Sequence, residues 1–503
     1  MQYLATGWAT WRLRKSQDET ARERAARHLS TRLGRLRGLP QKVGQMLTMS
    51  SDEDRNAIFE PLGNQAEPLP FSELSPLLER AWGKPHGQVV KAIDERGLAA
   101  SLGQVHRAFL HDGREVAVKI QYPGMKQAIE TDLDTLGWIA KPVGNLHAGF
   151  DMQAYRGTLR QGLEQELDYR IEAKNQRELS LAAEGLALVV PEVVNELSDE
   201  LVLTTSWEDG DSLAEAEGWP QAEKQRLAQA LLEQFLTFAF ERGILHSDPH
   251  PGNYRFRRSA QGPSVILYDY GCVYRIPERE RLLMLRLVAS AAALSAQDDP
   301  YPLLVELGFD AELLRPLRAK LPAVCRVLFE PFGSQGQFDM SGWNPSGRLE
   351  DVLGEDRLNF RIAGPARLLF FLRAYQGLLY YLRRLGEPVL WSGPLRKLLE
   401  RHGRAARALE LAEPVDPSTT FNALAKHLRI EVRQDSALKA QITLPASAVE
   451  RLEDFLEPEV HERIAARGIH VDEVIRKARR SGYAPSKLFE LEESSKSFAV
   501  WLE

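Results

Sequence analysis

The sequence predicts an α+β protein of two lobes, with a helical N-terminal extension and a small α+β appendage at the C-terminus. Strand-like alternation dominates from Gly97 to about Trp207, whereas helical periodicity dominates from Pro220 to about Arg404. An acidic, proline-containing stretch from Glu413 to Ser418 then marks a boundary, after which alternation returns. We therefore expect the extension at 1–85, the first lobe at 86–207, a mainly helical second lobe at 208–412 and the appendage at 413–503.

The composition argues against several classes of protein. The chain has 503 residues, of which 44% are hydrophobic and 27% are charged, as in soluble globular proteins. Its net charge of -6 argues against a protein that coats nucleic acid. Cys272 and Cys325 allow no disulfide framework beyond one bridge, no Cys/His cluster has zinc-site spacing, and a reducing compartment is favoured. The sequence shows no secretory signal and no apolar run of about 18 residues, so we expect a cytoplasmic protein.

The extension starts with a basic stretch that reads as helical. Nine arginine and lysine residues lie between positions 12 and 37, opposed by three acidic residues, and Trp8 and Trp11 precede all nine. One interpretation is an ordinary solvated helix face. The other is peripheral contact with an anionic membrane surface, for which basic residues and tryptophans are typical.

The two lobes are predicted from their local patterns. In the first lobe, Asp112-Gly113 predicts a hairpin, 154–181 predicts a helix, and 188–194 with 201–205 predicts a second strand pair. In the second lobe, 264–270 predicts a strand, and the apolar run 368–382, interrupted by Arg373, predicts a buried helix. The appendage has strand-like alternation at 428–432, 442–444 and 498–502, with helical text between the last two.

The segment from His246 to Asn253 carries the strongest chemical signal. Asp248 and Asn253 have the spacing of the kinase loop H-R-D-x-x-x-x-N, in which the Asp lies near the acceptor hydroxyl and the Asn binds the metal. Ser247 replaces the loop's Arg. A competing interpretation is a metal site made from His246, Asp248 and His250.

Other motifs follow in the order that a kinase-like fold requires. Lys119 ends a V-A-V-K strand and would bind phosphates, with Glu172 as its helix partner. Asp269 opens an Asp-Tyr-Gly motif and would hold Mg²⁺. The segment 204–210 lies where a hinge would contact adenine through its backbone. Each motif is weak alone, but their order predicts a two-lobed protein-kinase-like fold.

The chain resembles the UbiB-like atypical kinases, which include the bacterial ubiquinone-biosynthesis protein and the mitochondrial ADCK proteins. The loop H-x-D-P-H-P-G-N is typical of that family, as are K-x-G-Q at 42–45, an Ala-rich loop at 99–106 and E-x-D at 166–168. The resemblance covers about 30–400. The chain departs from the family at Leu98, where a further Ala is usual, and at Val43, where Leu is usual. It also has the appendage where the ubiquinone-biosynthesis member has membrane spans.

The resemblance implies a role for each matching residue. The implied catalytic residues are Asp248, Lys119 and Lys42, and Asn253 and Asp269 would bind Mg²⁺. Lys42 and Gln45, on an extension folded over the active-site cleft, would face Glu166 and Asp168. The implied nucleotide-binding residues are Ala99, Ala100, Ser101, Gly103, Val105, Lys119, Glu172, Thr205, Ser206 and Trp207.

The resemblance also implies an activity. It implies a kinase-like ATPase that binds ATP or ADP with Mg²⁺ and supports isoprenoid-quinone (ubiquinone) or other lipid metabolism, with a lipid or isoprenoid-phenol ligand. The extension would block protein phosphorylation in trans. The alternative is a non-catalytic scaffold that senses nucleotide within a biosynthetic complex.

Overall fold

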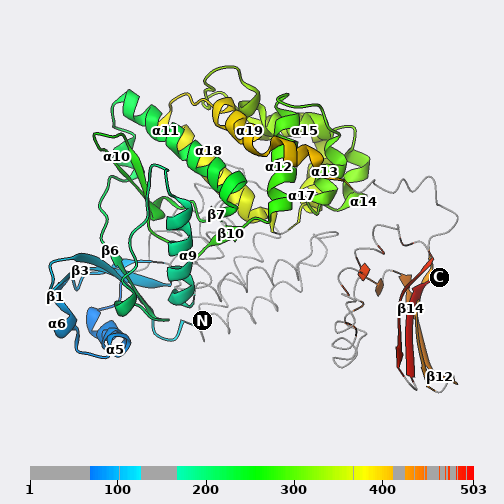
Figure 1. Cartoon of the computed structure of the whole chain (residues 1–503), viewed down its shortest axis with the longest axis horizontal. Coiled ribbons are helices and arrows are strands. Elements are labelled where there is room, and N and C mark those ends of the chain that lie inside the picture. Colours follow the sequence, from blue (N-terminus) through cyan, green and yellow to red (C-terminus); the bar gives the residue numbers. More distant parts are fainter. Residues whose placement is uncertain are drawn as a thin grey trace, which may run out of the picture. The chain divides into compact units, whose positions relative to one another are not determined.

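The computed structural model describes 68–100, 102–125, 167–365 and 367–411 of the chain. Towards the C-terminus it describes 425–434, 437–446, 485–493 and 496–503, with single positions between 448 and 483. The basic stretch, Lys42, Gln45, Ser101 and Glu166 lie outside the described residues. The chain divides into two units, one ending at Leu409 and the other beginning at Glu410 (Figure 1).

An antiparallel sheet forms the centre of the first lobe. Its strands follow the order β1-β3-β4-β6, and the short β2 pairs with β3. The β3–β4 turn is the predicted hairpin, in which Gly113 has φ of 92° and Asp112 Oδ1 accepts a hydrogen bond from Arg114 N at 2.9 Å. The strands are β1 (Val90–Ile93), β2 (Leu98–Ala99), β3 (Gly103–Leu110), β4 (Glu115–Gln121) and β6 (Val202–Ser206).

One face of this sheet packs against helix α5 (Phe71–Trp82), which is joined to β1 by the short α6 (His86–Val89). Leu74 and Leu78 of α5 are fully buried, as are Val116 and Val118 of β4 in the same core. Burying a leucine in this way contributes about 1.5–3 kcal/mol relative to leaving it exposed. Helix α5 precedes residue 86, so the core of the first lobe includes residues before the predicted start of that lobe.

Helix α9 (Tyr169–Ala182) lies in the segment predicted as helical and begins at an acidic cap. The side chain of Asp168 accepts a hydrogen bond from Arg170 N at 3.0 Å, which satisfies one of the free N–H groups of the first turn. Tyr169 and Ala173 pack with Leu203 of β6. This packing turns Glu172 inward, where it is 1% exposed.

The predicted second strand pair of the first lobe is confirmed only in part. Strand β5 (Leu188–Val189) pairs in parallel with β9 (Ser264–Leu267) of the second lobe, not with β6. The predicted pairing exists where Val193 forms an antiparallel bridge with Thr205, flanked by main-chain hydrogen bonds from Val194 N to Thr204 O and from Ser206 N to Glu192 O, both 2.8 Å. Alternation locates a strand in the sequence, but long-range packing selects its partner, and here β8 (Tyr254–Arg257) and β9 supply that partner.

The second lobe is mainly helical, as predicted. The apolar run interrupted by Arg373 forms α18, which ends at Gly386 in the left-handed region with φ of 69° and packs against α11 (Figure 1). The predicted burial is confirmed for one face of α18, whereas Leu369, Leu372 and Tyr380 are exposed. Strand β7 (Ile244–His246) pairs with β10 (Val273–Arg275). Among the described residues, no helix has the length and apolar character needed to cross a membrane. The helices are α10 (Leu213–Ala216), α11 (Gln221–Leu236), α12 (Glu278–Ala291), α13 (Pro300–Glu306), α14 (Ala311–Leu314), α15 (Leu321–Leu328), α16 (Pro345–Leu353), α17 (Arg357–Ala363), α18 (Leu368–Leu385) and α19 (Ser392–Ala408).

The second unit contains a four-stranded antiparallel sheet of order β12-β11-β14-β13. The three predicted strands are confirmed as β11 (His427–Gln434), β12 (Ala437–Pro445) and β14 (Lys496–Leu502). Strand β13 (Ser486–Glu493) was not predicted, because a register shift between Lys487 and Phe489 interrupts its alternation. One core contains Leu428, Ile430 and Val500 from this sheet.

Candidate nucleotide-binding and catalytic site

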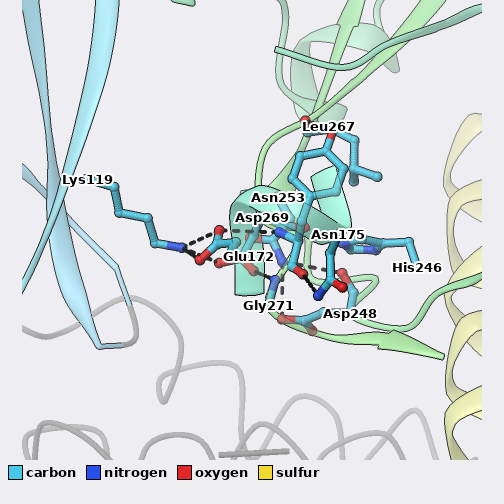
Figure 2. A network of polar contacts seen from close by, with 10 residues as sticks. Lys119, Glu172, Asn175, His246, Asp248, Asn253, Leu267, Asp269 and Gly271 are labelled. Carbon is cyan, nitrogen blue, oxygen red and sulfur yellow. Dashed lines mark hydrogen bonds and ion pairs between the residues drawn. The ribbon is translucent and has the colours of Figure 1, made fainter. Parts of the chain in front are cut away.

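The centre of the candidate site is an ion pair between the two segments that the sequence predicted as partners. Lys119 on β4 donates through Nζ to both carboxylate oxygens of Glu172 on α9, at 2.7 and 2.9 Å (Figure 2). The same Nζ lies 3.1 Å from Oδ2 of Asp269. The side chains of Lys119 and Glu172 are 15% and 2% exposed. One lysine therefore joins the first lobe to the Asp-Tyr-Gly motif.

The charges of this cluster depend strongly on one another. Burial lowers the pKa of Lys119, but the carboxylates of Asp269 and Glu172 more than offset this and hold that pKa well above its usual value. Burial raises the pKa of Glu172 to about 7, even though Lys119 acts in the opposite direction. The raised pKa of Lys119 favours the ion pair, whereas the raised pKa of Glu172 opposes it, because a proton on Glu172 would weaken the pair. Because two carboxylates face Nζ, we take Lys119 as charged and Glu172 as the group that titrates near neutral pH.

The Asp-Tyr-Gly motif is fixed by hydrogen bonds on both sides of its tyrosine. Gly271 N donates to Asp269 Oδ1 at 2.9 Å, and Asn175 Nδ2 donates to the carbonyl of Tyr270 at 2.9 Å (Figure 2). The Tyr270 hydroxyl is fully buried and donates to the carbonyl of Leu267 at 2.6 Å. Tyrosine thus fills the aromatic position of the motif, and its hydroxyl has a partner.

His246 supports this motif from the other side. Burial lowers its pKa below the usual value, so the ring is neutral at pH 7. Nε2 hydrogen bonds to the carbonyl oxygen of Asp269, which can only accept, so Nε2 carries the proton. Nδ1 then accepts from the Tyr254 hydroxyl at 3.3 Å. Both ring nitrogens are engaged in the structure.

The competing metal site is not supported by the geometry. His246 uses both nitrogens as described, and His250 Nδ1 accepts from Gly252 N at 3.1 Å. No group of three or more His, Cys, Asp and Glu side chains in the described part of the chain could hold a metal ion. The loop therefore does not bring His246, Asp248 and His250 together as ligands.

Asp248 is held by two donors. Arg373 of α18 donates through Nη2 to Asp248 Oδ1 at 2.6 Å, and Asn253 donates through Nδ2 to Asp248 Oδ2 at 3.1 Å. This use of Nδ2 leaves the amide oxygen of Asn253 as the group suited to a metal. Sequence reasoning missed Arg373 as a site residue. The available signal was an arginine within an otherwise apolar helix.

The predicted Ala-rich loop turns tightly next to Lys119. Ala100 N donates to the carbonyl of Gly103 at 2.8 Å. At Gly103 a Cβ would lie 2.3 Å from the carbonyl oxygen of Ile120, so this position requires glycine. Val105 on β3 pairs with Lys119 on β4, which places the strand after the loop beside the lysine. Ala99 lies in β2, on the other side of the turn.

The predicted hinge follows the end of β6. Ser206 N donates to the carbonyl of Glu192 at 2.8 Å, and Trp207 N donates to the carbonyl of Glu115 at 3.0 Å. Thr205 pairs with Ala117 within the sheet. The N–H groups of Ser206 and Trp207 are therefore used within the protein. A contact between adenine and this segment requires other main-chain groups.

Among the predicted cleft residues on the extension side, the structure describes Asp168. It caps α9 and forms an ion pair with Arg170 at 2.8 Å, while Arg170 also lies 3.3 Å from Glu200. Lys42, Gln45 and Glu166 lie outside the described residues. Their expected arrangement around Asp168 stays a prediction.

Comparisons with known proteins identify a kinase-like domain in this part of the chain. Residues 61–298 match the family model described as the ABC1 atypical kinase-like domain. Caenorhabditis elegans atypical kinase coq-8, mitochondrial, is 32% identical over 247 residues, or 48% of this chain and 33% of that protein. Rattus norvegicus atypical kinase COQ8B, mitochondrial, is 29% identical over 329 residues, or 63% of this chain and 61% of that protein. The chain thus spans less than two thirds of the length of either relative.

A solved structure shows the same overall architecture. The Mycobacterium tuberculosis protein Rv3197, solved with erythromycin, is 28% identical, with a TM-score of 0.52 over 76% of this chain and 98% of that one. The fold and the site define a two-lobed α+β protein of the kinase-like class, which confirms the predicted fold class. Residues 61–298 of the chain match an ABC1 atypical kinase-like domain, and the relatives named above are atypical kinases, which supports the resemblance to the UbiB/ADCK-like family.

Proposed function

We propose that this protein is an atypical kinase-like ATPase that binds ATP or ADP together with Mg²⁺. The observation that carries the proposal is the position of Lys119, 2.7 Å from Glu172 and 3.1 Å from Asp269. In active kinases the equivalent lysine, paired with a helix glutamate, binds the nucleotide phosphates, and the motif aspartate binds Mg²⁺. Here both contacts exist in one cluster, so the lysine needs no rearrangement to bind phosphate.

The residues present fit a magnesium ion. Mg²⁺ prefers oxygen ligands and keeps several waters, so one or two protein oxygens are enough. The side chain of Asp269 is 21% exposed, and Asn253 offers its amide oxygen, so both residues can supply an oxygen ligand. When bound, Mg²⁺ would neutralise charge on the phosphates. Asp248 would accept a hydrogen bond from the attacking group, while Ala99, Ala100, Ser101, Gly103, Val105 and the segment Thr205–Trp207 would line the nucleotide.

The biological setting is proposed from the relatives and the extension. The named relatives are atypical kinases of the COQ8 type, and the resemblance links that family to isoprenoid-quinone metabolism. We place this protein in ubiquinone or other lipid metabolism, with an isoprenoid-phenol or lipid ligand. The basic stretch at 12–37 would bring it to the cytoplasmic face of an anionic membrane.

The N-terminal extension would also limit the activity. Lys42 and Gln45 would lie over the cleft, with Glu166 and Asp168 as partners for the lysine, because a buried lysine requires carboxylates nearby. A peptide substrate would then lack access to Asp248. Phosphorylation of proteins in trans should be absent, while nucleotide binding is retained.

The test is ATP binding and hydrolysis by the full-length protein. We expect ATP or ADP with Mg²⁺ to raise the melting temperature, and ATP hydrolysis to increase with anionic liposomes and an isoprenoid phenol. Asp269→Asn should abolish the Mg²⁺-dependent shift, whereas Asp112→Asn, in the exposed hairpin, should leave it unchanged. Equal shifts for wild type and Asp269→Asn would rule out the metal role of Asp269.

A second candidate function is a scaffold that senses nucleotide without turnover. One observation favours it: both oxygens of Asp248 already accept hydrogen bonds, from Arg373 and Asn253. A sensor would bind Mg²⁺ and nucleotide without hydrolysis under any of these conditions. Measured turnover that Asp248→Asn abolishes would exclude this alternative.

A further inference from the structure

Three residues on one face of α18 contact the loop that carries Asp248. Arg373, Gly377 and Tyr381 are spaced by four, so they lie above one another on successive turns of the helix. Arg373 Nη2 lies 2.6 Å from Asp248 Oδ1, and the Tyr381 hydroxyl donates to the carbonyl of Pro249 at 3.0 Å. This face of α18, at 373, 377 and 381, is called the loop-contacting face below.

The approach of the helix to the loop is too close for a side chain at its centre. A Cβ at Gly377 would lie 2.0 Å from Cβ of Pro249 and 2.5 Å from its Cγ. Packing is looser beside this contact, where a cavity of about 60 Å³ is lined in part by His246, Tyr254 and Tyr381. The loop-contacting face therefore packs directly against the loop at Pro249.

Both partners of the ion pair on this face, Arg373 and Asp248, are buried. The side chains of Arg373 and Asp248 are 9% and 6% exposed. Removing two charges from water costs several kcal/mol per ion, so a buried pair of this kind is weak evidence for a stabilising role. Ser247, next to Asp248, is fully buried and donates its hydroxyl to Leu245 O at 3.2 Å, so the loop supplies no charge there. Arg373, which lies 125 positions along the chain from Asp248, supplies a positive charge at this carboxylate.

We propose that Arg373 is a positioning residue that holds the carboxylate of Asp248 in the orientation needed for turnover. This inference rests on the proposed function. Arg373 contacts Oδ1 and Asn253 contacts Oδ2, so donors on both oxygens restrict the rotation of the carboxylate. Small misplacements of a catalytic group cost about 100-fold in rate. Arg373 should therefore act on kcat and leave nucleotide affinity unchanged.

The test uses the full-length protein with Arg373→Met, Arg373→Lys, Asp248→Asn and the double variant Asp248→Asn/Arg373→Met. Arg373→Met should lower kcat for ATP hydrolysis by about 10- to 100-fold, with KM and the Kd for Mg²⁺-ADP changed by less than about twofold. Arg373→Lys keeps the charge and should retain intermediate turnover. Arg384→Met, which removes a partly exposed arginine from the same helix, is the matched control.

The double variant separates positioning from a structural role. If Arg373 acts through Asp248, its replacement causes no further loss in the Asp248→Asn background. Should Arg373→Met fail to fold, the same comparison is made with Arg373→Lys, alone and combined with Asp248→Asn. The inference would be overturned if the kcat losses of the two single variants multiplied in the double variant. A rise in Kd as large as the fall in kcat would also overturn it. Wild type that binds no nucleotide would overturn the proposed function as well, whereas unchanged turnover in both Arg373 variants would overturn this inference alone.

Discussion

Lys119 reaches Glu172 across 53 positions of sequence and holds both of its carboxylate oxygens, at 2.7 and 2.9 Å. The pair is buried, and Asp269 adds a second carboxylate at 3.1 Å. Removing the lysine would leave two acidic groups without this cation. Its removal should therefore change both the stability of the protein and its affinity for nucleotide.

We expect Lys119→Met to weaken the binding of Mg²⁺-ADP by at least about tenfold, because a charge-assisted contact to phosphate is worth about 1.5–3 kcal/mol. The same change should destabilise the nucleotide-free protein by about 3–5 kcal/mol, since it removes the cation that faces the buried carboxylate of Glu172. Calorimetric titration and chemical denaturation measure the two effects. Lys174→Met, which removes an exposed lysine from the nearby α9, is the control. Wild-type affinity in Lys119→Met would contradict the phosphate-binding role.

The pKa of Glu172 predicts a pH dependence of stability. Burial raises it from 4.5 to about 7 in the folded protein, so the folded state binds this proton more tightly than the unfolded state. The resulting stability is complete below pH 4.5 and is lost as the pH rises to about 7, in total up to about 3 kcal/mol. The Glu172→Gln variant lacks the titrating carboxyl group and therefore serves as the reference.

The free energy of unfolding of wild type, relative to Glu172→Gln, should therefore fall between pH 4.5 and 7 and level off above. Urea denaturation at several pH values measures the difference. Glu178→Gln, on the same helix and 37% exposed at its side chain, is the control and should follow wild type. A difference that stays constant over this range would show that Glu172 does not titrate there.

The tight contact at Gly377 predicts a steric effect. Gly377→Ala places a Cβ 2.0 Å from Pro249, and the surrounding backbone must move to accept it. Overpacking of this kind costs about 1–3 kcal/mol, and here it also displaces the loop of Asp248. We expect a lower melting temperature and lower ATP turnover.

Gly403→Ala is the matched control, because its nearest contacts would lie at 3.7 Å within α19. Alanine there should be neutral or stabilising by up to about 1 kcal/mol, through its higher helix propensity. Thermal unfolding compares the two variants directly. If Gly377→Ala behaves like Gly403→Ala, α18 does not support the loop as described.

The sequence predicted much of the site because its residues sit in short motifs with fixed spacing. Asp248 and Asn253 lie on one loop, and Lys119, Glu172 and Asp269 follow in an order that one fold explains. Arg373 could not be found in this way, since its partner is 125 positions away and no local pattern links them. What the sequence showed was an arginine where an apolar helix would not tolerate an unpaired charge.

The fold was predicted to a similar extent and for similar reasons. Alternation of apolar residues located β11, β12 and β14. In β11 and β14 it marks a buried face, with Leu428, Ile430 and Val500, whereas Ile442 of β12 is exposed. It missed β13, whose register shift interrupts the period, and it misassigned the partner of β5. Periodicity reports the face that a segment buries, but not the distant segment against which it packs.

The last prediction concerns Ala100 in the Ala-rich loop. Its N–H bonds to the carbonyl of Gly103 at 2.8 Å, so the loop turns tightly while carrying a Cβ that a Gly-rich loop lacks. Glycine would let the backbone approach the phosphates more closely and adopt further conformations. Ala100→Gly should therefore change the affinity or the selectivity for ATP over ADP and raise autophosphorylation in cis. If the extension blocks the cleft as proposed, phosphorylation of other proteins should stay absent in this variant. Binding titrations and radiolabelled ATP assays measure these effects, with Ala260→Gly, in an exposed turn, as the control. Nucleotide binding and autophosphorylation equal to wild type would show that the alanine does not set the nucleotide pose.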